Sequence, residues 1–218
     1  MIKDIKKIVC LKKASELLIL LLVAFVITLV NVVAFLSGVN DDVTIFIAFI
    51  SGIFSYVGFA VFFKPMMIPI EVPRGLSFGM TRHKLFVWSR IMDFAELFVL
   101  FLPLIFIPDF GVAVYLKLLI VCFGVIMWIE GLAANSILRF GKAAYFVYYF
   151  AFIALVMAIS RVYDKIPGFS EQMGKIFTAT LDTNLANFSI LVVFLLFTVA
   201  GLIVNWMTFR NVSVDYTA

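Results

Sequence analysis

The sequence predicts an all-α, polytopic membrane protein with six transmembrane helices, an N-terminal interfacial helix and both termini in the cytoplasm. Three observations predict it. The chain is 65% hydrophobic and 14% charged, whereas a soluble domain is usually about half apolar and about a quarter charged. Its apolar residues form six runs, most of them near the roughly 20 helical residues that cross a hydrocarbon core of about 30 Å. Its basic residues gather in alternate connections between these runs.

The first predicted element, residues 1–14, is an amphipathic helix that lies in the membrane interface. Its apolar side chains recur at three-residue spacing, at Ile2, Ile5, Ile8 and Leu11, and most of its lysines lie elsewhere around the helix. Such lysines favour anionic headgroups, so membrane lipid is an expected partner. The apolar run 17–36 is longer than the core of a signal peptide, about 7 to 15 residues, and we expect it to be retained as the first span.

Residues 15–218 are predicted to form a single transmembrane domain. Backbone groups in lipid must satisfy one another within a segment, which makes the spans helices. The predicted spans are Ser15–Leu36, Val43–Phe63, Leu85–Ile107, Gly111–Leu132, Ala143–Ser160 and Phe188–Phe209. Two connections are long, an inner loop at 64–85 and an outer loop at 161–187. Prolines at positions 65, 69 and 73 are expected to end the second helix.

The distribution of charge predicts the orientation in a plasma membrane. With the N-terminus inside, four basic residues lie outside and the other thirteen of the 17 lie in the cytoplasm, which fits an even number of spans. The net charge of +4 therefore has a topogenic origin, and no nucleic-acid partner is expected. Cys10 and Cys122 lie in different environments, so we expect no disulfide, and the chain has no Cys/His cluster to predict a metal site.

The third predicted span carries Arg90, Asp93 and Glu96 on one side, within about 120° at 100° per residue. Charges within a span cost roughly 2.5 to 3.5 kcal/mol each, so we expect Arg90 to pair with Asp93 at i, i+3. This pair would be either a cytoplasmic gate or a static packing contact. Glu130, at the end of the fourth span, has three readings: a partner of Arg139 or Lys142, a partner of Arg90 across the bundle, or an interfacial acid without a role.

The inner loop contains LSFGMTRHKLF, residues 76–86, and a later connection contains LRFGKAAYF, residues 138–146. The first resembles the segment between spans two and three of type-2 ABC transporter permeases of Gram-positive bacteria. The second resembles the turn between spans four and five of the same family. In size the chain is similar to the small permeases that export peptides such as phenol-soluble modulins and bacteriocins. His83 followed by Lys84 stands where a pair of Arg or Lys is commoner.

The resemblance implies that the inner loop docks on a separate ATP-binding subunit, of which two copies work with two permease copies, identical or related. The implied docking residues are Pro73, Arg74, Leu76, Phe78, Gly79, Met80, Thr81, Arg82, His83 and Lys84, with Arg139, Phe140, Gly141 and Lys142 in the second turn. ATP and Mg²⁺ would be bound by that partner. This chain contains no G-x-x-x-x-G-K-(S/T) motif of its own, so no cofactor is expected here.

The predicted function is therefore that of a non-catalytic transport subunit, which moves an amphipathic peptide or hydrophobic cargo out of a bacterial cell. One alternative is an intramembrane hydrolase-type enzyme that uses Asp93, Glu96, Glu130 or His83 for acid-base or metal chemistry. Membrane hydrolases usually have denser clusters of paired His and Glu. A second alternative is an immunity protein that works without an ATPase.

Overall fold

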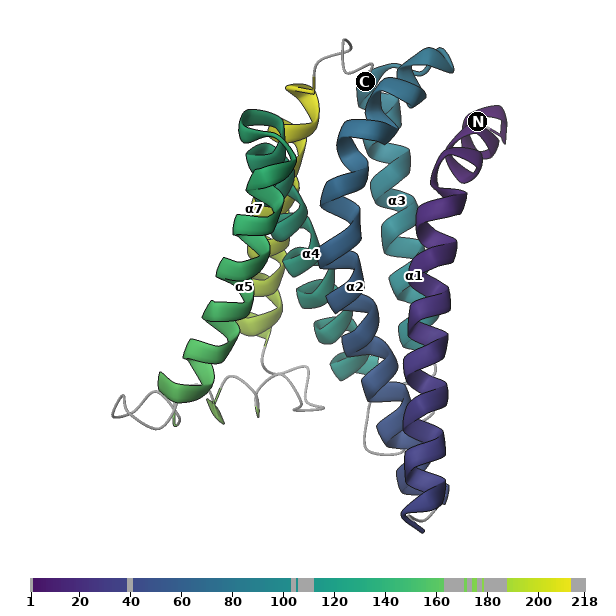
Figure 1. The fold of residues 1–218 in the computed structure, drawn as a ribbon, viewed down its shortest axis with the longest axis vertical. Coiled ribbons are helices and arrows are strands. Elements are labelled where there is room, and N and C mark those ends of the chain that lie inside the picture. Colours follow the sequence, from purple (N-terminus) through teal and green to yellow (C-terminus); the bar gives the residue numbers. More distant parts are fainter. Residues whose placement is uncertain are drawn as a thin grey trace.

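The computed structural model describes residues 2–38, 41–102, 105, 112–162, 171, 174–175, 178 and 188–212. In these residues the elements are all helices. They are α1 (Ile2–Leu36), α2 (Asp41–Ser77), α3 (Arg82–Phe101), α4 (Val112–Phe140), α5 (Lys142–Val162) and α7 (Phe188–Arg210). One end of the bundle, called the basic end here, carries the start of α1, the α2–α3 turn and the α4–α5 turn (Figure 1).

Four helical segments of the described residues are long and apolar enough to cross a membrane: Ser15–Ala34, Ile50–Ser77, Val112–Phe140 and Ile190–Arg210. An all-α fold of the membrane type is therefore supported. Helix α3 does not reach this standard, and its five charged residues lower its hydropathy. The apolar stretch of α5 is shorter, Ala143–Ala154. Six spans and the orientation of the termini stay predictions, and most of the predicted outer loop 161–187 lies outside the described residues.

Helix α2 overturns the prediction that prolines end it near Phe63. It continues through Pro65, Pro69 and Pro73 to Ser77. Each proline removes one backbone hydrogen bond, but four-residue spacing places all three losses along one side of the helix. The opposite side keeps its bonds, so the helix bends instead of ending, and Figure 1 shows α2 changing direction towards the basic end. Most of the predicted inner loop 64–85 is therefore helix.

The connection between α2 and α3 is a tight turn. Gly79 has φ +74°, its N–H donates to the carbonyl of Leu76 at 2.9 Å, and the N–H of Met80 donates to the carbonyl of Gly75 at 3.3 Å. This is a Schellman motif, which closes a helix with a glycine in the left-handed region. Thr81 then caps α3, because its side chain accepts from the N–H of Lys84 at 3.3 Å. Helices α2 and α3 thus form one hairpin.

Helix α4 extends beyond the predicted end at Leu132 to Phe140. Gly141, with φ +74°, makes the turn directly into α5, and its N–H donates to the carbonyl of Ile137 at 2.8 Å. The turn predicted at 139–142 is therefore present, although the helix before it is longer than expected.

Helices α4 and α7 approach each other closely through glycine. A Cβ on Gly131 would lie 2.9 Å from the backbone nitrogen of Asn205, and one on Gly201 would lie 2.7 Å from the Trp128 ring. The close approach lets side chains of one helix donate to backbone carbonyls of the other: Thr198 to Ile120 (2.9 Å), Asn205 to Met127 (3.2 Å), Thr208 to Gly131 (2.8 Å) and Trp128 to Phe197 (2.9 Å). Small residues and such bonds hold helices together where lipid supplies no hydrophobic driving force.

The buried apolar residues form two clusters. One lies in the middle of the bundle and includes Ile19, Tyr56, Leu97 and Met127. The other lies at the basic end and includes Ile8, Ile68, Val72, Met80 and Leu85. Ile8, which we expected to face lipid from an interfacial helix, is 1% exposed and packs against the α2–α3 hairpin.

Candidate functional site

Eight charged side chains of α1 to α4 meet between the two apolar clusters. This charged cluster consists of Lys12, Glu16, Lys64, Glu71, Arg90, Asp93, Glu96 and Glu130. On each of these helices, the charged residues lie between an apolar residue of the cluster at the basic end and an apolar residue of the cluster in the middle of the bundle. Charges in such surroundings lose their hydration, so each needs a partner of opposite charge or further hydrogen bonds.

Asp93 lies at the centre of the charged cluster. Its Oδ1 accepts hydrogen bonds from Nζ of Lys12 and Nζ of Lys64, each at 2.6 Å. Its Oδ2 lies 3.2 Å from Nη1 of Arg90, so the predicted Arg90–Asp93 pair is confirmed. One carboxylate, 1% exposed, therefore joins cations from three helices.

Arg90 also connects α3 to α4. Both of its terminal nitrogens donate to the carboxylate of Glu130, Nη1 to Oε2 and Nη2 to Oε1 at 2.9 Å. Two parallel bonds of this kind fix the orientation of both groups. Glu130 is 2% exposed, so the reading of an interfacial acid without a role is wrong. Of the open alternatives, pairing across the bundle with Arg90 is confirmed.

Lys64 reaches a group of three carboxylates from different helices. Its Nζ lies 3.2 Å from Glu16, 2.6 Å from Asp93 and 3.3 Å from Glu96, and the hydroxyl of Tyr56 donates to Glu96 at 2.8 Å. Oxygens of these three acids lie within 4.8 Å of one another, close enough to hold a metal ion. The ammonium of Lys64 occupies the place a cation would take. The acids are thus engaged in charge compensation, which favours a packing or gating role over acid-base chemistry.

Lys12 belongs to the predicted interfacial segment, yet it is 4% exposed. Burial lowers the pKa of an ammonium, but the nearby Asp93 carboxylate, with Glu71, outweighs this and raises the pKa of Lys12 above its ordinary value. Lys12 therefore remains charged at neutral pH. It fastens the start of α1 to α3.

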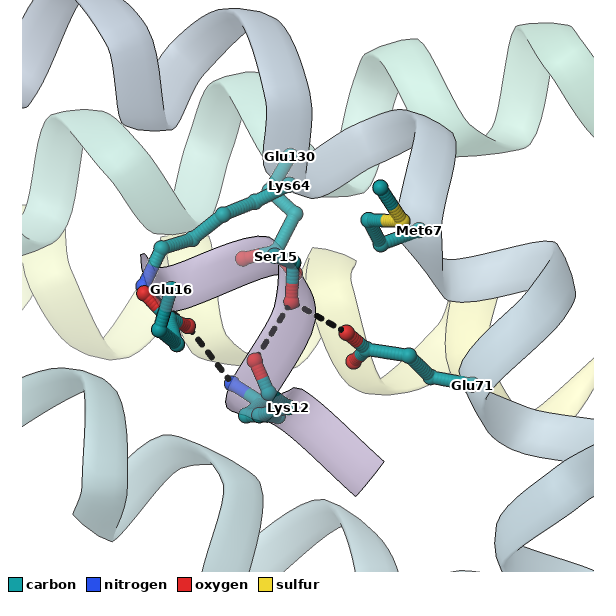
Figure 2. Close-up of a pocket in the computed structure, with 7 residues that line it drawn as sticks. All are labelled: Lys12, Ser15, Glu16, Lys64, Met67, Glu71 and Glu130. Carbon is teal, nitrogen blue, oxygen red and sulfur yellow. Dashed lines mark hydrogen bonds and ion pairs between the residues drawn. The ribbon is translucent and has the colours of Figure 1, made fainter. Parts of the chain in front are cut away.

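A small cavity with room for about one water molecule opens beside the charged cluster, between α1 and α2. Figure 2 shows its lining: Lys12, Ser15, Glu16, Lys64, Met67, Glu71 and Glu130. The hydroxyl oxygen of Ser15 lies 2.9 Å from the backbone carbonyl of Lys12 and 3.1 Å from Oε1 of Glu71. Oε2 of Glu16 is buried without a hydrogen-bond partner.

The implied docking residues lie on the α2–α3 hairpin at the basic end, and several are exposed. The exposed ones are Arg74, Phe78, Gly79, Thr81, His83 and Lys84, while Pro73 and Leu76 are partly covered and Met80 is buried. Arg82 is engaged within the chain, because its Nη1 donates to the carbonyls of Arg210 and Val212, the latter at 2.8 Å. Through this one nitrogen it closes the C-terminal end of α7.

The second implied docking segment lies at the same end of the bundle (Figure 1). Arg139 and Phe140 are exposed and Gly141 forms the turn, while the side chain of Lys142 lies outside the described part of the structure. No family model, curated protein or solved structure matches this chain.

Sequence reasoning missed four members of the charged cluster: Lys12, Glu16, Lys64 and Glu71. The lysines were attributed to topogenic charge, and the acids were not considered. A usable signal was present, because Lys12 and Glu16 are spaced i, i+4 and Glu71 is the one acid in an otherwise basic inner segment. Reading this signal required knowing that α2 remains helical through its prolines.

Proposed function

We propose that this chain is the non-catalytic, membrane-spanning subunit of an ATP-driven exporter of the type-2 ABC permease kind, in a bacterial plasma membrane. A separate ATP-binding subunit docks on the basic end at Pro73–Lys84 and Arg139–Lys142. What supports this is an exposed turn that holds the basic side chains of Arg74 and Lys84, the His83 ring and an aromatic side chain, Phe78, which is 44% exposed. Exposed apolar groups rimmed by charge are typical of docking surfaces.

The observation that carries the proposal is that one hairpin holds both the exposed turn and the centre of the charged cluster. Lys64 lies 13 residues before Ser77, and Asp93 lies 12 residues after Thr81. At 1.5 Å per helical residue, both charges are about 18 to 20 Å from the turn. A force on the turn therefore acts along α3 and along the proline-bent part of α2 on the ion pairs of Lys64 and Asp93 with α1. The charged cluster is the gate in this proposal.

The cargo is an amphipathic peptide or another hydrophobic molecule, which passes between two copies of the chain. ATP and Mg²⁺ are bound by the two ATP-binding subunits. Apolar side chains on α5 remain uncovered, among them Phe146, Val147 and Phe150, each at least 60% exposed. In the assembly such surfaces face lipid, cargo or the second copy, which accept broad apolar contact.

The test co-expresses the chain with an ATP-binding subunit that copurifies with it and measures ATP hydrolysis by the purified complex. The variant Arg74→Glu/Lys84→Glu reverses two exposed charges and leaves Arg82 intact, because Arg82 closes α7. We expect it to abolish cargo-stimulated hydrolysis while the chain stays in the membrane. The matched control, Lys13→Glu, reverses another exposed charge on α1 and should retain coupling.

Three outcomes would contradict the proposal. Coupling could be unchanged in the double variant. The chain could be functional while purifying without any nucleotide-binding partner, as the immunity reading predicts. The chain alone could show metal-dependent hydrolysis that requires Asp93, Glu96 or Glu130, as the enzyme reading predicts.

A further inference from the structure

The charged cluster contains more acids than bases. Its acids are Glu16, Glu71, Asp93, Glu96 and Glu130, and its bases are Lys12, Lys64 and Arg90. If all eight were ionised, the cluster would hold an excess of two negative charges in surroundings that offer little hydration. Uncompensated buried charge is costly, and the usual relief is to bind a proton.

The cations are shared unequally among these acids. Asp93 faces three of them, and Glu130 holds Arg90 through two bonds. Glu96 faces Lys64 and accepts a hydrogen bond from Tyr56. Glu16 meets Lys64 at 3.2 Å and Lys12 at 3.7 Å, both through Oε1, and its Oε2 has no hydrogen-bond partner. Among the described residues, Glu71 forms no ion pair, and its side chain bonds to Ser15.

The hydroxyl of Ser15 has one hydrogen and two neighbours that accept. It lies 2.9 Å from the carbonyl oxygen of Lys12 and 3.1 Å from Oε1 of Glu71, as Figure 2 shows. A carbonyl can only accept, so Ser15 must donate to Lys12 for that bond to exist. The same hydrogen is then shared with Oε1 of Glu71, so an ionised Glu71 would receive only part of one hydrogen bond from Ser15, whereas a protonated carboxyl group would supply a hydrogen of its own.

We propose that Glu71 is a proton-binding site: the folded protein holds it as a neutral carboxylic acid that donates to Oγ of Ser15, which donates to the carbonyl of Lys12. The charged groups that face this site are Lys12 and Glu16 from α1, Lys64 from α2, Arg90 and Asp93 from α3, and Glu130 from α4. The two lysines lie closest to Asp93, at 2.6 Å each. Because they compensate the charge of Asp93, the charge of Glu71 is compensated by a proton.

This site responds to movement of α1. Ser15 belongs to α1 and Glu71 to α2, so separating the helices removes the acceptor of the proton and increases the exposure of an acid that is only partly buried. Glu71 would then release its proton at neutral pH. The proton-binding site therefore links the proton content of the protein to the contact between α1 and α2. This inference does not depend on the proposed function.

Infrared spectroscopy of the full chain in lipid nanodiscs tests the proposal. At neutral pH the wild type should show the carbonyl stretching band of a protonated carboxyl group, which shifts in deuterated water and declines as pH rises. The band should be absent in Glu71→Gln and retained in Glu171→Gln, a control at an acid that is 69% exposed. Absence of the band in the wild type would overturn the proposal. Its loss in Glu16→Gln with retention in Glu71→Gln would do the same.

Unfolding temperature provides a second readout that does not depend on assigning a band. The folded wild type holds a proton that the unfolded chain gives up at neutral pH, so its unfolding temperature should fall as pH rises. Glu71→Gln keeps a donor to Ser15 and should show a smaller decline. Equal declines would contradict the proposal. A second result would also contradict it: the unfolding temperature of the wild type rises with added sodium chloride at constant pH, and Glu71→Gln abolishes this rise. That result would assign the site to a metal cation.

Discussion

Arg90 of α3 and Glu130 of α4 form a two-bonded ion pair across 40 positions of sequence, and both side chains are at most 7% exposed. This pair fixes the hairpin α2–α3 to α4, and through α4 to α7. A buried pair of this kind contributes little net stability compared with apolar residues, but removal of one partner leaves a charge that nothing compensates.

Replacement of the acid alone should therefore be severe. We expect Glu130→Gln to lower the free energy of unfolding by about 3 to 5 kcal/mol, because the guanidinium of Arg90 stays buried with half its partners. The double variant Arg90→Met/Glu130→Leu should recover most of the loss. Unfolding in mixed micelles measures both. A double variant no better than the single one would show that the pair stabilises in its own right.

The acids of the charged cluster should differ in how much each contributes to the free energy of unfolding, according to how deeply each is buried. Asp93→Asn leaves Lys12, Lys64 and Arg90 without their shared acceptor, and we expect a loss of about 3 to 5 kcal/mol. Glu96→Gln changes an acid whose side chain is 18% exposed and that an amide can partly replace, so its loss should be about 1 kcal/mol. The same unfolding assay ranks them. A larger loss for Glu96→Gln would contradict the central place of Asp93.

Arg82 should stabilise the C-terminal end of α7 and not contact a partner protein. We expect Arg82→Gln to cost about 1.5 to 3 kcal/mol, since it removes charge-assisted bonds to two backbone carbonyls. Hydrogen exchange should increase at the end of α7, over residues 207–212. Lys84→Gln is the control at an exposed neighbour. Equal exchange in the two variants would mean that Arg82 does not hold that end.

Gly131 of α4 should not be equivalent to Gly58 of α2. Gly131→Ala brings a Cβ to 2.9 Å from the Asn205 backbone and should cost about 1 to 3 kcal/mol through overpacking. Gly58→Ala meets nothing within 4 Å and should be neutral or stabilising by up to about 1 kcal/mol, because alanine favours a helix. A tolerated Gly131→Ala would show that α4 and α7 separate easily.

Local sequence predicted three features: composition and apolar runs predicted an all-helical chain of the membrane type, the resemblance of LRFGKAAYF predicted the turn at Gly141, and charge spacing predicted the Arg90–Asp93 pair at i, i+3. These signals failed where distant parts of the chain decide. Pro65, Pro69 and Pro73 end an isolated helix, but here packing on both sides holds α2 together. Lys12 was predicted to face lipid headgroups, because its partner, Asp93, lies 81 positions away in the sequence and only the fold brings the two together. Glu130 could be assigned to Arg90 only once the helices were arranged.

The central claim is that a separate ATP-binding subunit contacts the α2–α3 turn from the cytoplasm. A photoreactive amino acid placed at position 84, in cells that also contain that subunit, tests the claim most directly. The account predicts a cross-link to the ATP-binding subunit that changes in yield when nucleotide is depleted, and none from the same probe at position 171. Absence of a cross-link from position 84, while the subunit is bound to the chain, would contradict it.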